Sequence, residues 1–229
     1  MKILAIETST PVGSIALVEG PLLKAQSILN ISATHNQRLL PGIERILTDA
    51  GWSLDGLDGF AVSIGPGSFT GLRIGLSVIK GLAWATGKPL AGIPTLDALA
   101  GNVSFSSQQI CPILDARKGE IYTALYRRGD EGIPQKLTSY LVIKPEELVN
   151  LIVEKTVLVG DGLLPYGDYL EKELGDLLVQ APPHLNLVHA SSVGWLGWLK
   201  FRSGKYEDVS RITPLYVRPS EAELKRKSK

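Results

Sequence analysis

The order of strands and helices predicted along this chain occurs twice, and this repeat limits the fold more than any other feature. In the first part, three strands joined by short turns predict an antiparallel meander, and helices then alternate with further strands. A polar stretch at residues 101–109 follows, and a similar order begins again at residue 110. The sequence therefore predicts two similar α/β halves, 1–103 and 104–229, although the identity between them is negligible.

The expected elements follow from hydrophobic periodicity and from glycine and proline at their ends. In the first half we expect strands at 2–7, 13–19, 22–31, 60–64 and 90–93, and helices at 34–50, 71–85 and 96–100. In the second half we expect strands at 110–115, 120–127, 136–143 and 156–159, and helices at 145–153, 163–174 and 191–201. The last helix and the tail are free to pack on either half.

Composition narrows the class of protein. Lysine and arginine total 24 and aspartate and glutamate total 23, so the net charge of +1 argues against binding nucleic acid through a uniformly basic surface. The single cysteine, Cys111, excludes an internal disulfide and a thiolate metal cage, and we expect it to be buried. The longest uncharged stretch, 177–199, is too polar for a membrane span, and no secretory signal fits the N-terminus. We therefore expect a cytoplasmic protein with no membrane partner.

A glycine-rich segment, Gly65–Gly71, joins a buried strand to a helix. Backbone N–H groups at such a helix start can hold an anion, so a phosphate loop is one interpretation. No Gly-Lys-Ser/Thr sequence follows, so the segment is not a Walker loop. The equally weighted alternative is that Gly65, Gly67 and Gly71 serve a tight turn and close packing of the helix.

The helix at 71–85 carries apolar residues over more than half of its circumference, and its polar side contains only Arg73, Ser77, Lys80 and Trp84. An ordinary surface helix needs a narrower apolar stripe, so this helix is expected to be covered on two sides. One side is its own sheet. The other is either the helix at 34–50 or a partner chain, and Gly71 and Gly75 would allow a close approach there.

Several segments, taken in order, resemble the TsaB family, also called YeaZ. The longest is GPGSFTGLRIG at 65–75. The others are IETST at 6–10, HNQRLLP at 35–41, IPTLDAL at 93–99, LDARKGEIY at 114–122 and PLYVR at 214–218. The similarity is dense over residues 1–125 and thin from about 130 to 205.

The resemblance implies an actin-like ATPase (ASKHA) fold, made of two RNase H-like halves with mixed five-stranded sheets flanked by helices. It also implies a role in making threonylcarbamoyladenosine, the modified base beside the anticodon of some tRNAs. In that family the chain is not the transferase. It supports the catalytic paralogue TsaD as a heterodimer, TsaE joins as a third component that handles ATP, and TsaC-type enzymes supply threonylcarbamoyl-adenylate. tRNA would be bound only through the complex.

Departures from TsaD lead us to expect a pseudoenzyme. TsaD carries a pair of metal-binding histidines where this sequence has Thr95 and Leu99, and those side chains cannot replace two imidazoles at a transition metal. The corner at 115–118 replaces a glycine-rich second phosphate loop, and Glu7 adds negative charge beside the first turn. We therefore expect no catalytic residue, no metal and no intrinsic cofactor, with ATP or ADP only at the interface of the complex.

Two sets of residues carry the expected sites. The partner interface is expected on the 34–50 and 71–85 helices, and the same face is expected to form a homodimer when the chain is alone. Its members are Leu39, Ile43, Leu47, Gly71, Ile74, Gly75, Val78 and Leu82. The vestigial phosphate-loop candidates are Thr8, Ser9, Gly65, Gly67 and Ser68.

Two rival functions stay open at this point. One is a free-standing phosphotransferase or peptidase of the same fold, which turnover of ATP or peptide by the isolated chain would reveal. The other is a direct tRNA-binding module, in which Arg117, Lys118 and the basic tail at 225–229 would contact the phosphate backbone. A steep dependence of tRNA binding on salt would favour that module.

Overall fold

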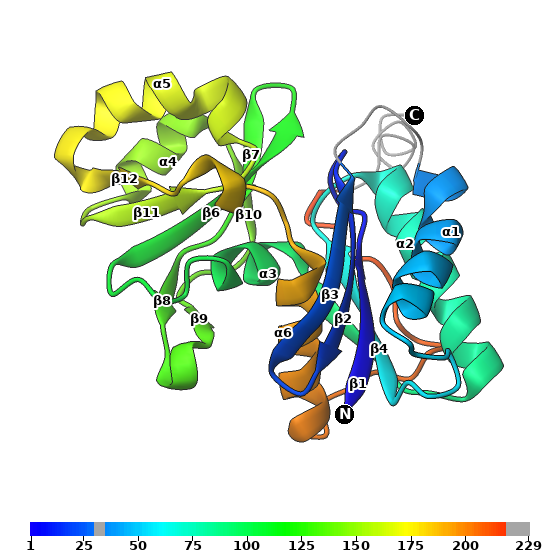
Figure 1. Cartoon of the computed structure of the whole chain (residues 1–229). Helices are drawn as coiled ribbons and strands as arrows, with labels where there is room; N and C mark the ends of the chain where they lie inside the picture. Colours follow the sequence, from blue (N-terminus) through cyan, green and yellow to red (C-terminus); the bar gives the residue numbers. More distant parts are fainter. Residues whose placement is uncertain (30–34, 219–229) are drawn as a thin grey trace. The chain divides into compact units, whose positions relative to one another are not determined.

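A computed structural model describes residues 1–29 and 35–218, which fall into two compact units (Figure 1). Unit 1 contains residues 1–98 and 188–214, and unit 2 contains residues 99–187 and 215–218. The division expected at residue 103 therefore lies near the first boundary. The chain returns to unit 1 at residue 188, which assigns the last helix to the first unit.

The sheet of unit 1 has five strands in the order β3-β2-β1-β4-β5. They are β1 (Lys2–Glu7), β2 (Gly13–Glu19), β3 (Leu22–Leu29), β4 (Gly59–Gly65) and β5 (Leu90–Pro94). The first three strands pair in antiparallel fashion, whereas β1, β4 and β5 are parallel neighbours, so the sheet is mixed. The expected end of the third strand at residue 31 lies outside the described residues.

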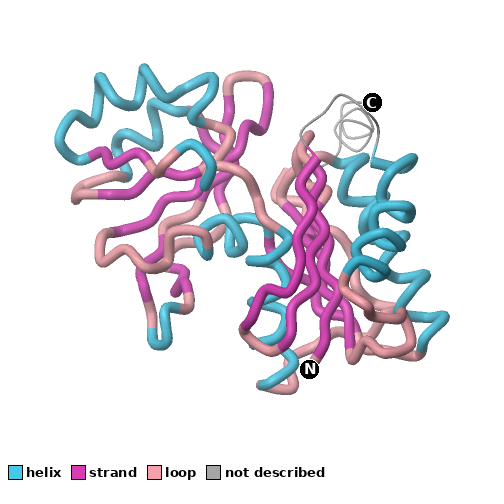
Figure 2. Tube along the Cα trace, in the orientation of Figure 1, coloured by secondary structure: helices cyan, strands magenta, loops and turns pink. Residues whose placement is uncertain are grey.

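Helices cover both faces of this sheet, which is visible in Figure 2. On one face lie α1 (His35–Asp49) and α2 (Phe69–Thr86), whose apolar residues join those of the strands in one core cluster. On the other face lies α6 (Ala190–Arg202), which packs on β1, β2 and β4. None of the described helices combines the length and the apolar character that crossing a membrane requires.

Small residues allow α6 to lie close to the sheet. A Cβ atom added at Gly194 would lie 3.1 Å from the Cβ of Ala5, and one added at Gly197 would lie 2.6 Å from the Cβ of Ala61. Ala5 and Ala61 therefore face α6. Because side chains alternate along a strand, the residues two positions further on, Glu7 and Ser63, lie on the same face.

The second sheet follows the strand order β10-β7-β6-β11-β12, with β8 paired to β6 and β9 paired to β8. The strands are β6 (Gln109–Arg117), β7 (Glu120–Thr123), β8 (Tyr126–Arg128), β9 (Pro134–Lys136), β10 (Leu141–Ile143), β11 (Thr156–Val159) and β12 (Leu178–Gln180). The helices are α4 (Pro145–Leu151) and α5 (Leu163–Leu174), while α3 (Thr95–Gly101) contains the boundary between the units. Short 3₁₀ turns lie at Asp130–Gly132, Gly175–Leu177 and Pro183–Leu185.

The main path of the second sheet repeats the pairing of the first. In chain order, β6, β7 and β10 form the antiparallel part, and β6, β11 and β12 are parallel neighbours. The expected repeat is therefore present, but β8 and β9 are added to its second copy, so the second sheet has seven strands and not the expected five. The strand expected at 136–143 is divided between β9 and β10. The three-residue strand β12 was not expected, because so short a segment has no readable alternation.

Candidate functional site

The most constrained part of unit 1 is the contact between the β1–β2 turn and the start of α2. The backbone N–H of Ser68 donates to the carbonyl oxygen of Ser9 over 2.6 Å. The Thr8 hydroxyl donates to the carbonyl oxygen of Gly71 over 2.8 Å. Ser68 also caps α2, since its Oγ accepts from the Gly71 N–H over 3.2 Å. The turn and the helix start thus hold each other through four neighbouring residues.

The glycines of the motif explain why this contact can be so close. A Cβ atom at Gly67 would lie 2.3 Å from the Ser9 carbonyl oxygen. One at Gly71 would lie 2.0 Å from the Thr8 carbonyl oxygen, and one at Gly75 would lie 2.2 Å from Thr8 Oγ1. The close approach expected at Gly71 and Gly75 is therefore made to the β1–β2 turn of the same chain. The expectation of a second helix at these two positions needs correcting, because the turn already fills that space.

All five vestigial phosphate-loop candidates belong to this assembly. Gly65 ends β4, Gly67 and Ser68 form the loop, and Thr8 and Ser9 form the turn that they contact. The Ser68 N–H, the Gly71 N–H and the hydroxyls of Thr8 and Ser9 all donate to groups within the chain. This geometry favours the tight-turn interpretation of the glycine-rich segment over a phosphate loop.

Glu7 lies beneath the turn and is fully buried. Its Oε1 accepts from the Ser9 backbone N–H, and from the Ser9 hydroxyl over 2.5 Å. Burial raises the pKa of Glu7 to about 7, against the opposing effect of the Ser63 and Ser9 hydroxyls and of the backbone at Ser9 and Thr10. A carboxyl group thus anchors the turn on which α2 rests.

The residues expected at a partner interface fall into two groups. Leu39, Ile43 and Leu47 are buried in the core of unit 1, each with 7% or less of its surface exposed. Gly71 and Gly75 are also buried. The other three are half-buried and pack against the same core cluster. They are Ile74, Val78 and Leu82.

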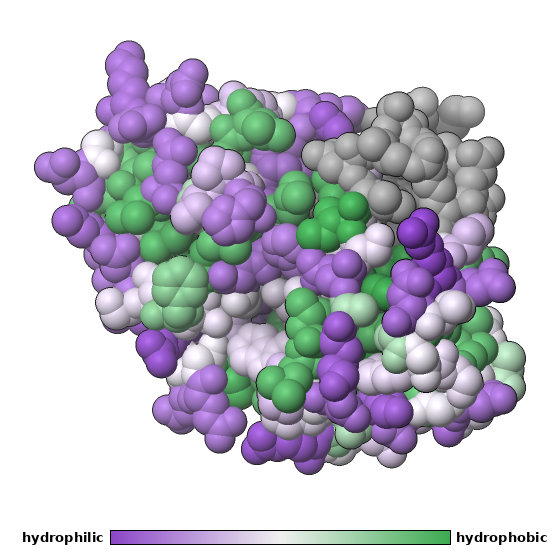
Figure 3. Space-filling view, in the orientation of Figure 1, coloured by the Kyte–Doolittle hydropathy of each residue, from purple (hydrophilic) through white to green (hydrophobic). Residues whose placement is uncertain are grey.

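Three large apolar side chains that the sequence reasoning did not select are more exposed on these helices. The exposed fraction is 52% for Leu40, 38% for Phe69 and 70% for Trp84. Hydrophobic residues interrupt the hydrophilic surface where α1 and α2 lie (Figure 3). The exposure of Trp84 could have been predicted from the sequence, because the helical projection already placed this residue on the polar side of α2.

A second cover of α2 comes from the segment after α6. The Lys80 ammonium group donates to the carbonyl oxygens of Ser210 and Ile212 over 3.4 and 3.2 Å. Ile212 is buried in the same core cluster as α2. The Glu207 carboxylate fixes this segment further, because it accepts from the Gly92 N–H over 3.0 Å and pairs with Lys200 over 2.7 Å. The sequence reasoning had considered only α1 or a partner chain as the second cover.

Comparison with known proteins identifies the family. The family model TsaD, tRNA N6-adenosine threonylcarbamoyltransferase, matches residues 29–225. The tRNA threonylcarbamoyladenosine biosynthesis protein TsaB of Escherichia coli is 35% identical over 227 residues, which cover 97% of this chain and 96% of the relative. The chain belongs to the TsaB family. The expected resemblance is thus confirmed.

Solved structures agree with this TsaB assignment. YeaZ from Pseudomonas aeruginosa has a TM-score of 0.80 at 27% identity, covering 94% of this chain and 99% of the other. The ROK hexokinase of Thermus thermophilus has a TM-score of 0.51 at 14% identity, covering 89% of this chain and 100% of the other, which indicates the fold alone. The expected actin-like ATPase fold, with its two mixed α/β units, is confirmed.

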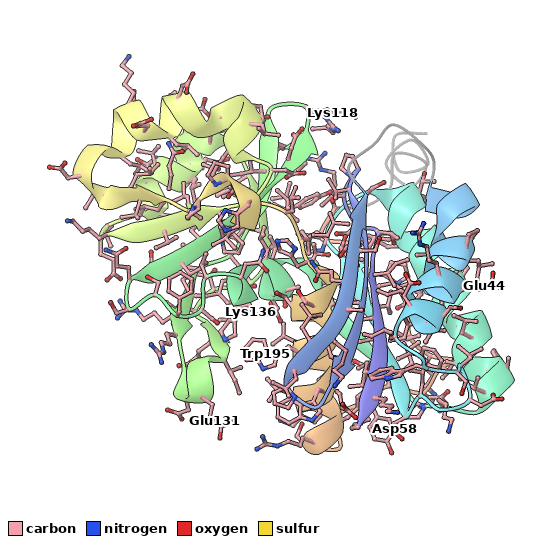
Figure 4. The ribbon with its side chains drawn as sticks, in the orientation of Figure 1. Glu44, Asp58, Lys118, Glu131, Lys136 and Trp195 are labelled. Atoms are coloured by element: carbon pink, nitrogen blue, oxygen red, sulfur yellow. The ribbon has the colours of Figure 1, made fainter. Side chains whose placement is uncertain are left out.

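The TsaB-family chain has a second corner of interest in unit 2, between β6 and β7. Arg117, Lys118 and Gly119 have φ angles of 62°, 57° and 79°, and Lys118 lies at the tip (Figure 4). The Arg117 guanidinium pairs with Asp115 over 3.0 Å. Arg218, from the PLYVR segment, pairs with Glu120 and donates to the Ala116 carbonyl oxygen over 3.3 Å. The acidic residues on both sides of the corner, Asp115 and Glu120, are therefore paired with arginines of this chain.

The two residues that the resemblance places where TsaD would carry histidines are buried. Thr95 and Leu99 each have none of their surface exposed. Within residues 1–29 and 35–218, no group of three or more histidine, cysteine, aspartate or glutamate side chains has a metal-binding arrangement. The Cys111 thiol is buried, and burial raises its pKa to about 12, so it is held as a neutral thiol.

Proposed function

We propose that this chain is a non-catalytic subunit required for threonylcarbamoyl transfer to the adenosine next to the anticodon of tRNAs. The observation that carries the proposal is the near full-length similarity to TsaB of E. coli, which is named as a tRNA threonylcarbamoyladenosine biosynthesis protein. In this role the chain dimerises with the catalytic subunit TsaD, and TsaE completes the complex. The chain works in the cytoplasm, needs no cofactor of its own, and meets tRNA and ATP or ADP only within the complex.

The chemistry of the described residues favours a role in which this chain assists a catalytic partner over one in which it catalyses a reaction itself. In the loop that could hold phosphate, the Ser68 N–H donates to the Ser9 carbonyl oxygen of the β1–β2 turn and the Gly71 N–H donates to Ser68 Oγ. The corner of unit 2 carries Asp115 and its partner Arg117, so a phosphate there would meet an acidic group. A hydroxyl at Thr95 and an aliphatic side chain at Leu99 cannot ligate a transition metal as two imidazoles do.

The outer side of α1 and α2 is the surface we assign to TsaD. It exposes Leu40, Phe69 and Trp84 and is flanked by the half-buried Ile74, Val78 and Leu82. Gly81 lies on the same side of α2, and a Cβ atom there would meet nothing within 4 Å. A partner helix can therefore approach α2 at Gly81. When TsaD is absent, the same surface pairs with a second copy of the chain.

Trp84→Ala is expected to weaken the association with TsaD by about 10- to 100-fold, because large exposed aromatic residues often dominate interface energies. The thermal stability of the isolated chain should not change, since the side chain is mostly exposed. Titration calorimetry with a TsaD protein from the same source measures the affinity. Phe105→Ala is the matched control: Phe105 is exposed to the same 70% but lies in unit 2. Equal affinities of the two variants would contradict the assigned surface.

The function itself is tested by reconstitution. tRNA, threonine, bicarbonate and ATP are incubated with a TsaC-type enzyme, TsaD and TsaE, with and without this chain, and the modified nucleoside is measured by mass spectrometry. We expect modification only when the chain is present. ATP turnover by the isolated chain, or modification that does not depend on it, would instead favour a free-standing enzyme of the same fold.

A further inference from the structure

Strand β5 lies at an edge of the first sheet, because β4 is the only one of the described strands beside it. Along a strand, the backbone N–H and C=O groups of successive residues point alternately to the two sides. The Pro89 carbonyl oxygen accepts from the Phe60 N–H of β4 over 3.0 Å, so it points inward. The alternate residues Leu90, Gly92 and Pro94 therefore direct their backbone groups toward the open edge.

Groups from the end of α6 and from the segment after it occupy this edge. The Glu207 N–H donates to the Leu90 carbonyl oxygen over 3.1 Å, in an antiparallel bridge. The Glu207 carboxylate accepts from the Gly92 N–H over 3.0 Å, and the Lys200 ammonium donates to the Gly92 carbonyl oxygen over 2.7 Å. Pro94 has no N–H group to satisfy. One ion pair therefore takes up both backbone groups of Gly92, in the middle of the strand.

The segment after α6 passes round this edge from one face of the sheet to the other. A Cβ atom at Gly197 would lie 3.8 Å from the Cβ of Ala91, so Ala91 faces α6. The next residue, Gly92, faces the opposite way, and a Cβ atom there would lie 2.8 Å from Cδ1 of Ile212. Ile212 belongs to the core cluster that contains α2. Glu207 therefore lies at the point where the chain crosses the edge.

An uncovered β5 edge would be open to association. The strand has no charged side chain, and unpaired N–H and C=O groups on such a strand can pair with a strand of another molecule. The opposite edge, β3, is protected differently, since Lys24 is the extra residue of a bulge against β2 and pairs with Glu19 over 3.0 Å. Both a bulge and an edge lysine discourage strand addition. On β5 the corresponding charges come from Lys200 and Glu207.

We propose that the Lys200–Glu207 ion pair is a lock that keeps the β5 edge closed to strand addition by a second copy of this chain. The carboxylate supplies the acceptor and the ammonium the donor that a neighbouring strand would offer to Gly92, and the two charges lie 2.7 Å apart. Without the carboxylate, the Gly92 N–H loses its partner and Lys200 loses its counterion. Only the Glu207 backbone then holds the segment on β5. This inference does not depend on the proposed partner or reaction.

Glu207→Ala opens the lock, and Glu207→Gln is the matched control. Both variants change the net charge equally, but glutamine keeps an oxygen that accepts from the Gly92 N–H. Analytical ultracentrifugation over a range of concentrations should find Glu207→Gln in the same state as the wild type and Glu207→Ala in larger species. Equal states of the two variants would overturn the proposal. Lys200→Ala removes the donor to the Gly92 carbonyl oxygen, so it should also associate, and it replaces Glu207→Ala if that variant does not fold.

Hydrogen exchange at the Gly92 amide, measured by NMR, locates the change. In dilute solution this amide should exchange roughly 10- to 100-fold faster in Glu207→Ala than in the wild type, because a hydrogen bond to a charged acceptor is lost. At high concentrations of Glu207→Ala the exchange at Gly92 should slow again, since a second copy would pair with it. Larger species without this slowing would mean that the copies meet elsewhere, which would refute the lock. An unprotected Gly92 amide in the wild type would refute it without any variant.

The outcome is distinct from the homodimer proposed through α1 and α2. A chain with two separate self-pairing surfaces assembles beyond a dimer, so Glu207→Ala should exceed a dimer if the helix surface also pairs. If the helix surface does not pair, the wild type is a monomer and Glu207→Ala forms a dimer. Either pattern supports the lock, so failure of the proposed homodimer leaves this test intact.

Discussion

Replacing Gly71 with alanine is expected to lower the free energy of unfolding of unit 1 by about 3 kcal/mol. The added Cβ would lie 2.0 Å from the Thr8 carbonyl oxygen, which is backbone and cannot rotate away. To accept the methyl group, α2 must move from the turn, and the hydrogen bond from the Thr8 hydroxyl to the Gly71 carbonyl oxygen is then lost. The substitution is expected to damage the isolated chain itself, before any partner binds.

Urea denaturation followed by tryptophan fluorescence measures this effect. All four tryptophans, Trp52, Trp84, Trp195 and Trp198, lie in unit 1, so the signal reports on that unit. Gly81→Ala is the control in the same helix, because a Cβ there meets nothing within 4 Å. It should stabilise the helix by roughly 0.5–1 kcal/mol, since alanine is the better helix former. If Gly71→Ala and Gly81→Ala were equally stable, the close contact between Gly71 and Thr8 would not be what requires glycine at position 71.

Replacing Gly160 with alanine is expected to have a comparable effect in unit 2, with a loss of about 4 kcal/mol. Gly160 follows β11 as Gly65 ends β4, and its φ of 133° is strained for any residue with a side chain. A Cβ atom would also lie 2.0 Å from the Ile113 carbonyl oxygen, the group that accepts from the Gly162 N–H. The substitution therefore adds steric overlap to backbone strain.

Gly175→Ala separates these two causes. Gly175 also has a positive φ, of 51°, but a Cβ there meets nothing within 4 Å, so we expect a loss of only about 1–2 kcal/mol from strain. Hydrogen exchange measured by mass spectrometry on peptides from β6 and β11 follows unit 2, while tryptophan fluorescence follows unit 1. Equal losses in Gly160→Ala and Gly175→Ala would show that contact with Ile113 contributes little.

Much of the fold could be predicted from the sequence because its signals are local. Hydrophobic periodicity and glycine or proline at element ends predicted most helices and strands, and the repeated order predicted two related units. Errors occurred where segments are short. The three residues of β12 carry too little pattern, and the strand expected at 136–143 is divided at residues 137–140. The return of the chain to unit 1 at residue 188 was also left open, because periodicity identifies an apolar face but not the surface that covers it.

Some features of the candidate site could likewise be predicted from the sequence, and others could not. The sequence by itself determined that Gly65–Gly71 joins a strand to a helix, that α2 is apolar on most sides, and that the motifs resemble the TsaB family. Only the tertiary structure decided that Gly71 and Gly75 face Thr8 and that the segment around Ile212 covers α2. Only the strand register placed Ser14, Glu7 and Ser63 beside one another on one face of the first sheet. The physical reason is that contacts between residues far apart in the chain depend on which surfaces meet, and local propensity does not encode that choice.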